Sequence, residues 1–429
     1  MSNPVIRGGL RLLNAFAASG LAEEYGVEDR AKELVSRATS LGIDLMGRVG
    51  RRPRDDSKPQ GPKRRFDLTP TESQDLLRST LRRFALEVLR PEAEKADVAM
   101  RPPADVLDMA ADLGLTELFV PEEYGGAAEE RSPVTTALIA EALGYGDMGL
   151  GAALLAPASV AHLVLDHGDE AQKEALCARL LGDGFVPAAA ALLEPRIGFD
   201  PRKPKTKAKR DGGGYRLQGE KVMVPLGETA ELFVVSAQLG GDARLFVVDR
   251  GLEGVEITPQ PTMGLRAANL CKVELRGVRV GKDALLGAGL EAPTDHQRVV
   301  DLGRVAWGAL AVGQCEAVLD YVKEYCNDRI AFGEPISHRQ AVAFLVADIA
   351  IETEAMRLLV WRAAARAERG LPMTQHAHLA AVQCARYAPK IGTDGVQLLG
   401  GAGFVREHPV ERWYRHLRAM GIMEGGLSA

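Results

Sequence analysis

The sequence predicts an α+β protein in which an antiparallel β domain separates two helical domains. Three observations predict this order. Residues 66–186 carry apolar residues at helical spacing, and residues 187–290 contain short segments rich in Val, Leu and Phe, separated by Gly, Asp and Pro. Residues 291–429 return to long segments with helical periodicity.

Residues 1–65 form a separate N-terminal extension ahead of these domains. The apolar residues of 1–50 fall near helical spacing, which predicts helices. These helices are either a docking element, for another chain or a membrane surface, or a partly ordered extension. Residues 51–65 contain three prolines, seven basic residues and two acidic residues, a composition typical of a solvated basic linker.

The first helical domain opens at Thr69, which precedes Pro70 and has Glu72 three residues later. This pattern predicts a helix N-cap with proline in the first turn. An apolar stripe follows at helical spacing, made of Leu76, Leu77, Leu81, Phe84, Val88 and Leu89. Further helices are expected near residues 103–114, 134–147, 157–167 and 170–182.

The middle domain contains strand signals at the spacing of hairpins. The basic stretch 201–214 is expected to be a solvated hairpin, and the alternative is that it steers an anionic ligand. The predicted strands are 215–224, 231–238, 243–250, 255–260 and 272–280.

The last domain is predicted to be a helical bundle. Its helices are expected at about 294–327, 338–369 and 375–398, and all three have apolar faces. Long helices of this kind stabilise one another by packing their apolar faces together in a bundle.

Composition excludes several classes of protein. The net charge of −5 over 429 residues argues against a nucleic-acid-binding protein, which usually has a basic excess. No apolar run approaches the roughly 18 residues that span a bilayer, and the N-terminus lacks the continuous apolar stretch of a signal peptide. The five cysteines are scattered and form no CxxC pair, which predicts buried, reduced thiols in a cytoplasmic protein and no metal site.

Five segments, in order along the chain, resemble motifs of the acyl-CoA dehydrogenase family. The resemblance runs from about Leu68 to Gly425 and implies that family's fold, with a C-terminal four-helix bundle. It also implies a flavoprotein oxidoreductase of fatty acid metabolism. The segments are "ADLGLTELFVPEEYGG" (111–126), "LEPRIGFD" (193–200), "YRLQGEK" (215–221), "RIAFGEPISHRQ" (329–340) and "GVQLLGGAGFVREHPVERWYR" (395–415).

The resemblance implies that Glu424 is the catalytic base. The family has a Glu-Gly pair downstream of a Pro-Val-Glu motif, and here Pro409-Val410-Glu411 leads without a gap to Glu424-Gly425. Other members carry the base immediately before an arginine of the first bundle helix, but here Gly303 precedes Arg304. A carboxylate beside apolar residues suits the role, because burial raises its pKa and makes it a stronger base.

The same resemblance places Asp301 and Arg304 at the acyl-CoA site and FAD between subunits. The alternative for Asp301 and Arg304 is an ion pair between residues three apart on one helix. The alternative for the paired glycines near residue 400 is an ordinary helix stop. The residues implied for FAD are Arg329, Phe332, Gln340, Gln397, Gly400, Gly401 and Gly425, and no residue is implied for a metal.

The chain departs from the family pattern where the flavin ring is expected. Leu193 and Phe199 replace a usual Thr and Ser, Met223 replaces an aromatic residue, and Pro225 replaces the Thr whose donors approach flavin N5. Each lost hydrogen bond removes roughly 0.5–1.5 kcal/mol of binding free energy. Beyond Glu424-Gly425 the family continues with Thr and a further helix, whereas Gly426 and three residues follow here.

The sequence therefore supports one main hypothesis and two alternatives. In the first, Glu424 removes the α-proton of an acyl-CoA while the β-hydrogen leaves as hydride to flavin N5, and the electrons pass to an electron-transfer flavoprotein. The second is a non-catalytic or half-active subunit that acts through a partner chain. The third is another flavin reaction on the same fold, such as oxidation by oxygen. All three allow a homo- or hetero-oligomer, either a dimer or a tetramer.

Overall fold

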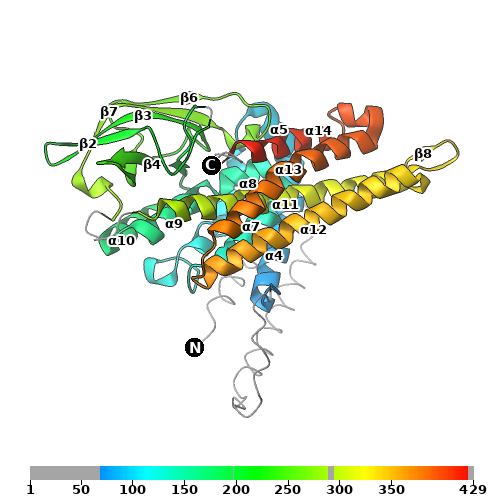
Figure 1. Ribbon diagram of the computed structural model, residues 1–429, viewed down its shortest axis with the longest axis horizontal. Helices are drawn as coiled ribbons and strands as arrows, with labels where there is room; N and C mark the ends of the chain where they lie inside the picture. Colours follow the sequence, from blue (N-terminus) through cyan, green and yellow to red (C-terminus); the bar gives the residue numbers. More distant parts are fainter. Residues whose placement is uncertain (1–67, 197, 288–293, 424–429) are drawn as a thin grey trace, which may run out of the picture.

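The computed structural model describes residues 68–196, 198–287 and 294–423. The predicted helices and linker of residues 1–65, and the proposed site residues Glu424 and Gly425, lie outside these described residues. In Figure 1 the β sheet lies at one end of the molecule, and the long C-terminal helices run side by side from it to the other end.

The N-terminal part is helical, as the sequence predicts. Helix α7 is almost entirely buried, and α8 is a short helix that the sequence did not predict. Asp147 separates the two, because its Oδ1 accepts hydrogen bonds from the backbone N–H of Gly149 (2.9 Å) and Leu150 (3.0 Å). The helices are α4 (Glu72–Phe84), followed by a π-helical turn (Ala85–Leu89), α5 (Arg90–Ala99), α6 (Ala104–Asp112), α7 (Pro133–Gly146), α8 (Met148–Leu154), α9 (Ala156–His167) and α10 (Glu170–Leu180).

The predicted N-cap at Thr69 is wrong, and Thr71 caps α4 instead. The Thr71 hydroxyl accepts a hydrogen bond from the backbone N–H of Gln74 (3.3 Å), and the Gln74 side chain accepts one from the backbone N–H of Thr71 (2.9 Å). This reciprocal capping box satisfies two backbone donors at once. Glu72 then lies in the first turn, beside the positive end of the helix dipole.

The middle domain is a seven-stranded, mostly antiparallel sheet in the order β1-β4-β2-β3-β7-β6, with β5 paired to β4. The basic stretch forms the predicted hairpin, β2 with β3. Strand β1, a run of four alanines, was not predicted and pairs parallel with β4, because alanine alone carries no strand signal. The strands are β1 (Ala188–Ala191), β2 (Lys207–Asp211), β3 (Gly214–Val224), β4 (Leu232–Leu239), β5 (Asp242–Asp249), β6 (Val255–Pro259) and β7 (Cys271–Val280).

The C-terminal part contains the three predicted long helices and a shorter fourth. The β8–β9 hairpin joins α11 to α12, and Figure 1 shows it at the end of the molecule opposite the sheet. The elements are α11 (His296–Asp328), β8 (Ile330–Ala331), β9 (Glu334–Pro335), α12 (Gln340–Glu368), α13 (Thr374–Leu399) and α14 (Val410–Leu417).

Helix α11 packs very closely against α7. A Cβ atom added to Gly144 of α7 would lie 2.2 Å from the carbonyl oxygen of Leu310, and one added to Gly313 of α11 would lie 1.9 Å from that of Glu141. Glycine at these positions therefore lets the two backbones touch.

The main apolar core extends continuously from α4 to α14, whereas most of the sheet has a core of its own. The exact domain boundaries stay a proposal.

In the described part of the chain, no single helix has the length and apolar composition to cross a membrane. Helices α8 and α9 pass that test only as a pair bent by 44°, and most of their residues are buried in the protein. Across residues 68–196, 198–287 and 294–423, no group of His, Cys, Asp and Glu side chains is placed to hold a metal ion.

All five cysteines are free and buried, as the sequence predicts. Burial raises the pKa of Cys177 and Cys271 to about 11 and that of Cys384 to about 12. The folded protein therefore keeps these thiols protonated at a pH where the unfolded chain ionises them. The cytoplasmic location expected from reduced cysteines stays a prediction.

We expect the free energy of unfolding to fall as the pH rises from about 8.5 towards 11. The thiol contribution is fully present below the unfolded pKa and is lost as the pH passes the folded pKa. Urea unfolding at pH 8 and pH 10 measures the fall, and a Cys177→Ala/Cys384→Ala variant is the control, since it should fall less. An equal fall in both proteins would contradict the assignment.

Candidate active site

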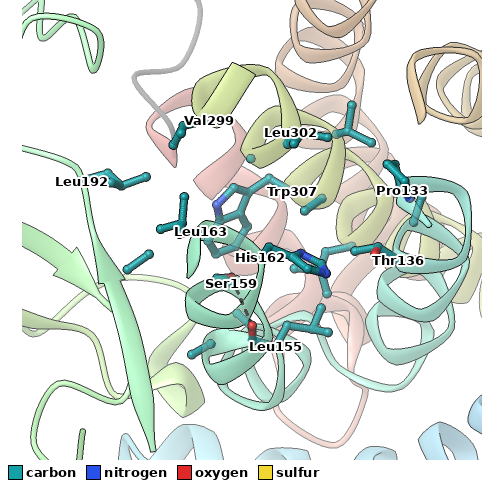
Figure 2. Close-up of a pocket in the computed structure, with 18 of the residues that line it drawn as sticks. Pro133, Thr136, Leu155, Ser159, His162, Leu163, Leu192, Val299, Leu302 and Trp307 are labelled. Carbon is teal, nitrogen blue, oxygen red and sulfur yellow. Dashed lines mark hydrogen bonds between the residues drawn. The ribbon is translucent and has the colours of Figure 1, made fainter. Parts of the chain in front are cut away.

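A cavity of about 130 Å³ lies between the N-terminal helices, the edge of the sheet and α11. Figure 2 shows side chains from α9 and α11 facing one another across it. Most of its wall is apolar, so it suits a hydrocarbon group. The apolar wall includes Pro133, Ala137, Leu155, Leu163, Leu192, Pro225, Val299, Leu302, Trp307 and Leu310.

Helix α11 supplies one whole side of the cavity. Val299, Gly303, Ala306 and Leu310 recur at three- or four-residue spacing, so one face of the helix lines the space. Gly303 is the residue at the alternative base position, and it carries no side chain there. Pro225 lines the same cavity from the end of β3. The structure thus brings together two positions that the resemblance assigned to substrate and flavin chemistry.

A buried ion pair anchors the β-domain wall of the cavity. Lys221 Nζ lies 3.0 Å from Glu194 Oε1 and donates to Ser236 Oγ (2.9 Å) and to the Leu192 carbonyl (3.2 Å). Burial lowers the pKa of Lys221 to about 8. Burial alone would raise the pKa of Glu194, but Lys221 and the backbone N–H groups of Thr206 and Lys205 lower it below its usual value. The pair fixes the segment that carries Leu192. The quoted motifs contain both residues, yet sequence reasoning assigned neither a role.

The predicted acyl-CoA residues lie on α11 beside the cavity-lining Gly303. Asp301 and Arg304 are both buried, and Arg304 Nη1 lies 3.8 Å from Asp301 Oδ1. Gln297 Nε2 also donates to Asp301 Oδ1 (2.8 Å). The alternative of an ion pair within one helix is therefore present in the structure, and a role in substrate binding stays a prediction.

The residues expected to face the flavin ring form an apolar surface. Leu193 and Phe199 are buried, and Arg196 stacks over the Phe199 ring at 5.2 Å. Met223 has a left-handed backbone (φ 55°) at a bulge in β3, and its N–H donates to Gln260 Oε1 (3.0 Å). These side chains offer contact area for a planar ring but no hydroxyl donor.

The other residues expected for FAD lie far from the cavity within one chain. Arg329, Phe332 and Gln340 are exposed around the β8–β9 hairpin, and Phe332 is 94% exposed. Figure 1 shows this hairpin at the opposite end of the molecule from the sheet. One chain therefore does not bring the two predicted parts of the FAD site together.

The chemistry of this distant group fits a nucleotide diphosphate. Among the described residues, the Arg329 guanidinium has no hydrogen bond or ion pair, so its donors are available to anionic oxygens. Gln397, Gly400 and Gly401 are exposed at the end of α13. An added Cβ at either glycine would meet nothing within 4 Å, which leaves room for a ligand to approach the backbone. The apolar ring surface and this polar group together fit FAD.

Sequence reasoning did not identify the side chains that shape the cavity. His162 and Trp307 face each other across it in Figure 2, and they come from α9 and α11. Arg131 and Asp166 form an ion pair in its wall. None of these residues stands in a motif, so the sequence contains no local signal for them.

Comparison with known proteins gives one consistent result over these described domains. Models of the acyl-CoA dehydrogenase N-terminal, middle and C-terminal domains match residues 71–183, 189–278 and 294–427. A probable acyl-CoA dehydrogenase of Bacillus subtilis is 31% identical over 368 residues, covering 84% of this chain and 96% of the relative.

Solved structures agree with the sequence relatives. The butyryl-CoA dehydrogenase of Megasphaera elsdenii is 28% identical, with a TM-score of 0.77, and the match covers 84% of this chain and 97% of that one. A chain in a structure described as an electron transferring flavoprotein of Acidaminococcus fermentans is 29% identical, with a TM-score of 0.77, and the match covers 84% and 96%.

Proposed function

The chain belongs to the acyl-CoA dehydrogenase family, and we propose that it dehydrogenates an acyl-CoA thioester between its α- and β-carbons. The mostly apolar cavity carries this proposal, because two residues of its wall, Gly303 and Pro225, align with family positions at the substrate and at the flavin. As a member of this family the chain is an FAD-dependent oxidoreductase.

FAD would supply the hydride acceptor for the hydrogen of the β-carbon. The chain's own residues would hold and orient the reactants. Leu193, Phe199 and Met223 would offer the ring apolar contacts, and the apolar wall of the cavity would surround the acyl group. Arg329 and Phe332 would hold the diphosphate and adenosine parts, with Gln340 nearby. Gln397, Gly400 and Gly401 would meet the cofactor from the neighbouring chain, and Gly425 would contact it as well.

Glu424 takes the α-proton in this proposal. Met423, the last described residue, is buried in the main core. Ile422, the residue before it, is 53% exposed. Because Gly303 cannot hold a proton, Glu424 is the carboxylate that matches a base position of the family.

We also propose that the chain acts as an oligomer and passes its electrons to an electron-transfer flavoprotein. Large apolar side chains recur every seventh residue along α12, and all are exposed: Phe344 (60%), Ile351 (64%) and Leu358 (52%). A second copy of the chain would cover this face. It would also bring its β8–β9 hairpin to the first chain's FAD, which resolves the separation of the two parts of the site.

We expect purified protein to show a flavin absorption band that bleaches when a short acyl-CoA is added without oxygen.

Substituting Arg329→Gln should weaken FAD binding roughly tenfold to a hundredfold, because a hydrogen bond to a charged group contributes about 1.5–3 kcal/mol. Titration of FAD by fluorescence quenching measures this change.

The exposed Arg101 provides the control, since Arg101→Gln removes the same charge just after α5, which Figure 1 shows away from the β8–β9 hairpin. FAD binding by that variant should equal the wild type. Protein that stays colourless with added FAD would overturn the proposed reaction and favour the non-catalytic subunit. A flavin that is not bleached by any acyl-CoA would overturn it as well.

A further inference from the structure

One end of the cavity is polar, although the rest of its wall is apolar. His162, Thr136 and the Arg131–Asp166 ion pair all line the space. Figure 2 shows the His162 ring on the side of the cavity toward Thr136 and Pro133, away from Leu192 of the β domain. If the thioester lies on the β-domain side of the cavity, beside Leu192, the His162 and Thr136 side chains face the far end of the acyl group.

His162 and Arg131 both keep free hydrogen-bonding capacity. Thr136 donates to the Ser132 carbonyl (3.0 Å), whereas Arg131 pairs with Asp166 through Nη1 and has a buried Nε without a partner among the described residues. In the described part of the chain the His162 ring makes an edge contact with Phe119 (5.5 Å) but no hydrogen bond. The His162 side chain is half-buried and lines the cavity, so a bound molecule can supply the missing partner.

The local charge decides what kind of partner suits His162. Burial, and then the nearby Arg131, hold the pKa of His162 well below its usual value, so the imidazole is neutral and presents one N–H donor and one acceptor. Asp166 already neutralises Arg131, so a carboxylate of the substrate would be buried beside an existing one at a high cost, whereas an uncharged oxygen can accept the imidazole N–H.

The volume limits the size of the acyl group. A cavity of about 130 Å³ is close to the engineered 150 Å³ apolar cavity that accepts benzene, and it therefore holds roughly six non-hydrogen atoms. The Trp307 indole lines the same space.

We propose that the substrate is a short acyl-CoA whose far end carries an uncharged oxygen, a carbonyl or hydroxyl, which hydrogen-bonds to His162. This inference rests on the proposed dehydrogenase function and names the substrate class of the same cavity. His162 is a specificity-determining residue, because it lies at the far end of the substrate and not at the reacting carbons.

Two acyl-CoA thioesters of matched shape test the inference. In 4-oxopentanoyl-CoA a carbonyl oxygen replaces a methyl group of 4-methylpentanoyl-CoA. We expect kcat/KM for flavin reduction to favour the oxo compound by about tenfold or more. His162→Leu should bring the ratio to about one or below, and His162→Gln, which keeps an N–H donor, should retain part of the preference.

Ser159→Ala is the matched control on the same helix. The Ser159 hydroxyl already donates to the Leu155 carbonyl (3.1 Å), so the substrate ratio should not change in this variant.

Calorimetric binding of both thioesters separates the proposed substrate class from the proposed dehydrogenase function. Flavin reduction with no preference in rate or binding overturns the inference and leaves the dehydrogenase function standing. A binding preference without flavin reduction supports the inference and overturns the function. A preference for glutaryl-CoA over both also overturns the inference, because charge would then be recognised.

Discussion

Replacing Glu424 with glutamine should slow flavin reduction by acyl-CoA by roughly 10²–10⁴-fold, the usual contribution of a positioned general base. Glutamine has nearly the same shape but cannot accept the α-proton at neutral pH. The FAD absorption band and the affinity for acyl-CoA should stay close to those of the wild type, since the amide keeps the size of the side chain. Stopped-flow absorbance without oxygen measures the reduction rate.

The exposed Glu407 supplies the matched control, because Glu407→Gln removes a carboxylate from the same C-terminal region without touching a base position. Its reduction rate should equal that of the wild type. If the Glu424→Gln variant still bleaches at the wild-type rate, Glu424 is not the base, and the α-proton leaves through another group.

Substituting Asp147→Ala should lower the free energy of unfolding by about 3–5 kcal/mol, the range for breaking a buried ion pair on one side. Asp147 Oδ2 lies 3.2 Å from Arg412 Nε and 3.1 Å from His416 Nε2, and all three residues are buried. His416 Nδ1 in turn accepts from the backbone N–H of Leu265 (2.9 Å). The Asp147 carboxylate therefore connects α8 directly to α14 and, through His416, to the β domain.

The pH dependence of this contribution follows from the Asp147 environment. Burial alone would raise the pKa of Asp147, but His416, Arg412 and backbone N–H donors hold it well below its usual value. Its stabilising contribution is therefore present above the unfolded pKa near 3.9 and is lost only as the pH falls far below that value. Urea unfolding at pH 7 and pH 5 should show the same deficit in the variant.

Asp169 provides a matched control for the loss of an N-cap. It caps α10 through a hydrogen bond from Gln172 N (3.0 Å) but has no buried ion pair, so Asp169→Ala should cost only about 1 kcal/mol. Asp147→Asn keeps an oxygen that can cap α8 while it removes the charge opposite Arg412. Equal losses for Asp147→Ala and Asp169→Ala would show that the buried ion pair contributes little.

Much of the fold was predictable because helical and strand periodicity is a local property. The long helices α11, α12 and α13 fall within two residues of their predicted limits. The errors have local causes too. Both Thr69 and Thr71 have a suitable partner three residues on, and only the geometry of the capping box selects Thr71. A four-alanine strand carries no side-chain pattern, so β1 was missed.

The candidate site was predictable only in part. Motif register alone proposes Glu424 as the base and gives Gly303 as a position without one. The role of Glu424 stays a prediction, because this residue lies outside the described part of the chain. The structure contributes the finding that Gly303 and Pro225 share one cavity, although 77 positions of sequence separate them. It also shows the β8–β9 hairpin, which follows Arg329, at the end of the molecule opposite the sheet, and this separation motivates the oligomer.

The sequence by itself determined the family, the order of the helical and β domains, the buried thiols and the identity of the proposed base, because these depend on residue type and local spacing. Only the tertiary structure decided the shape and polarity of the cavity. His162, Trp307 and Arg131 come from α9, α11 and the loop before α7, and their proximity depends on how those segments pack. A cavity is the space that distant side chains leave unfilled, so no local pattern in the chain encodes it.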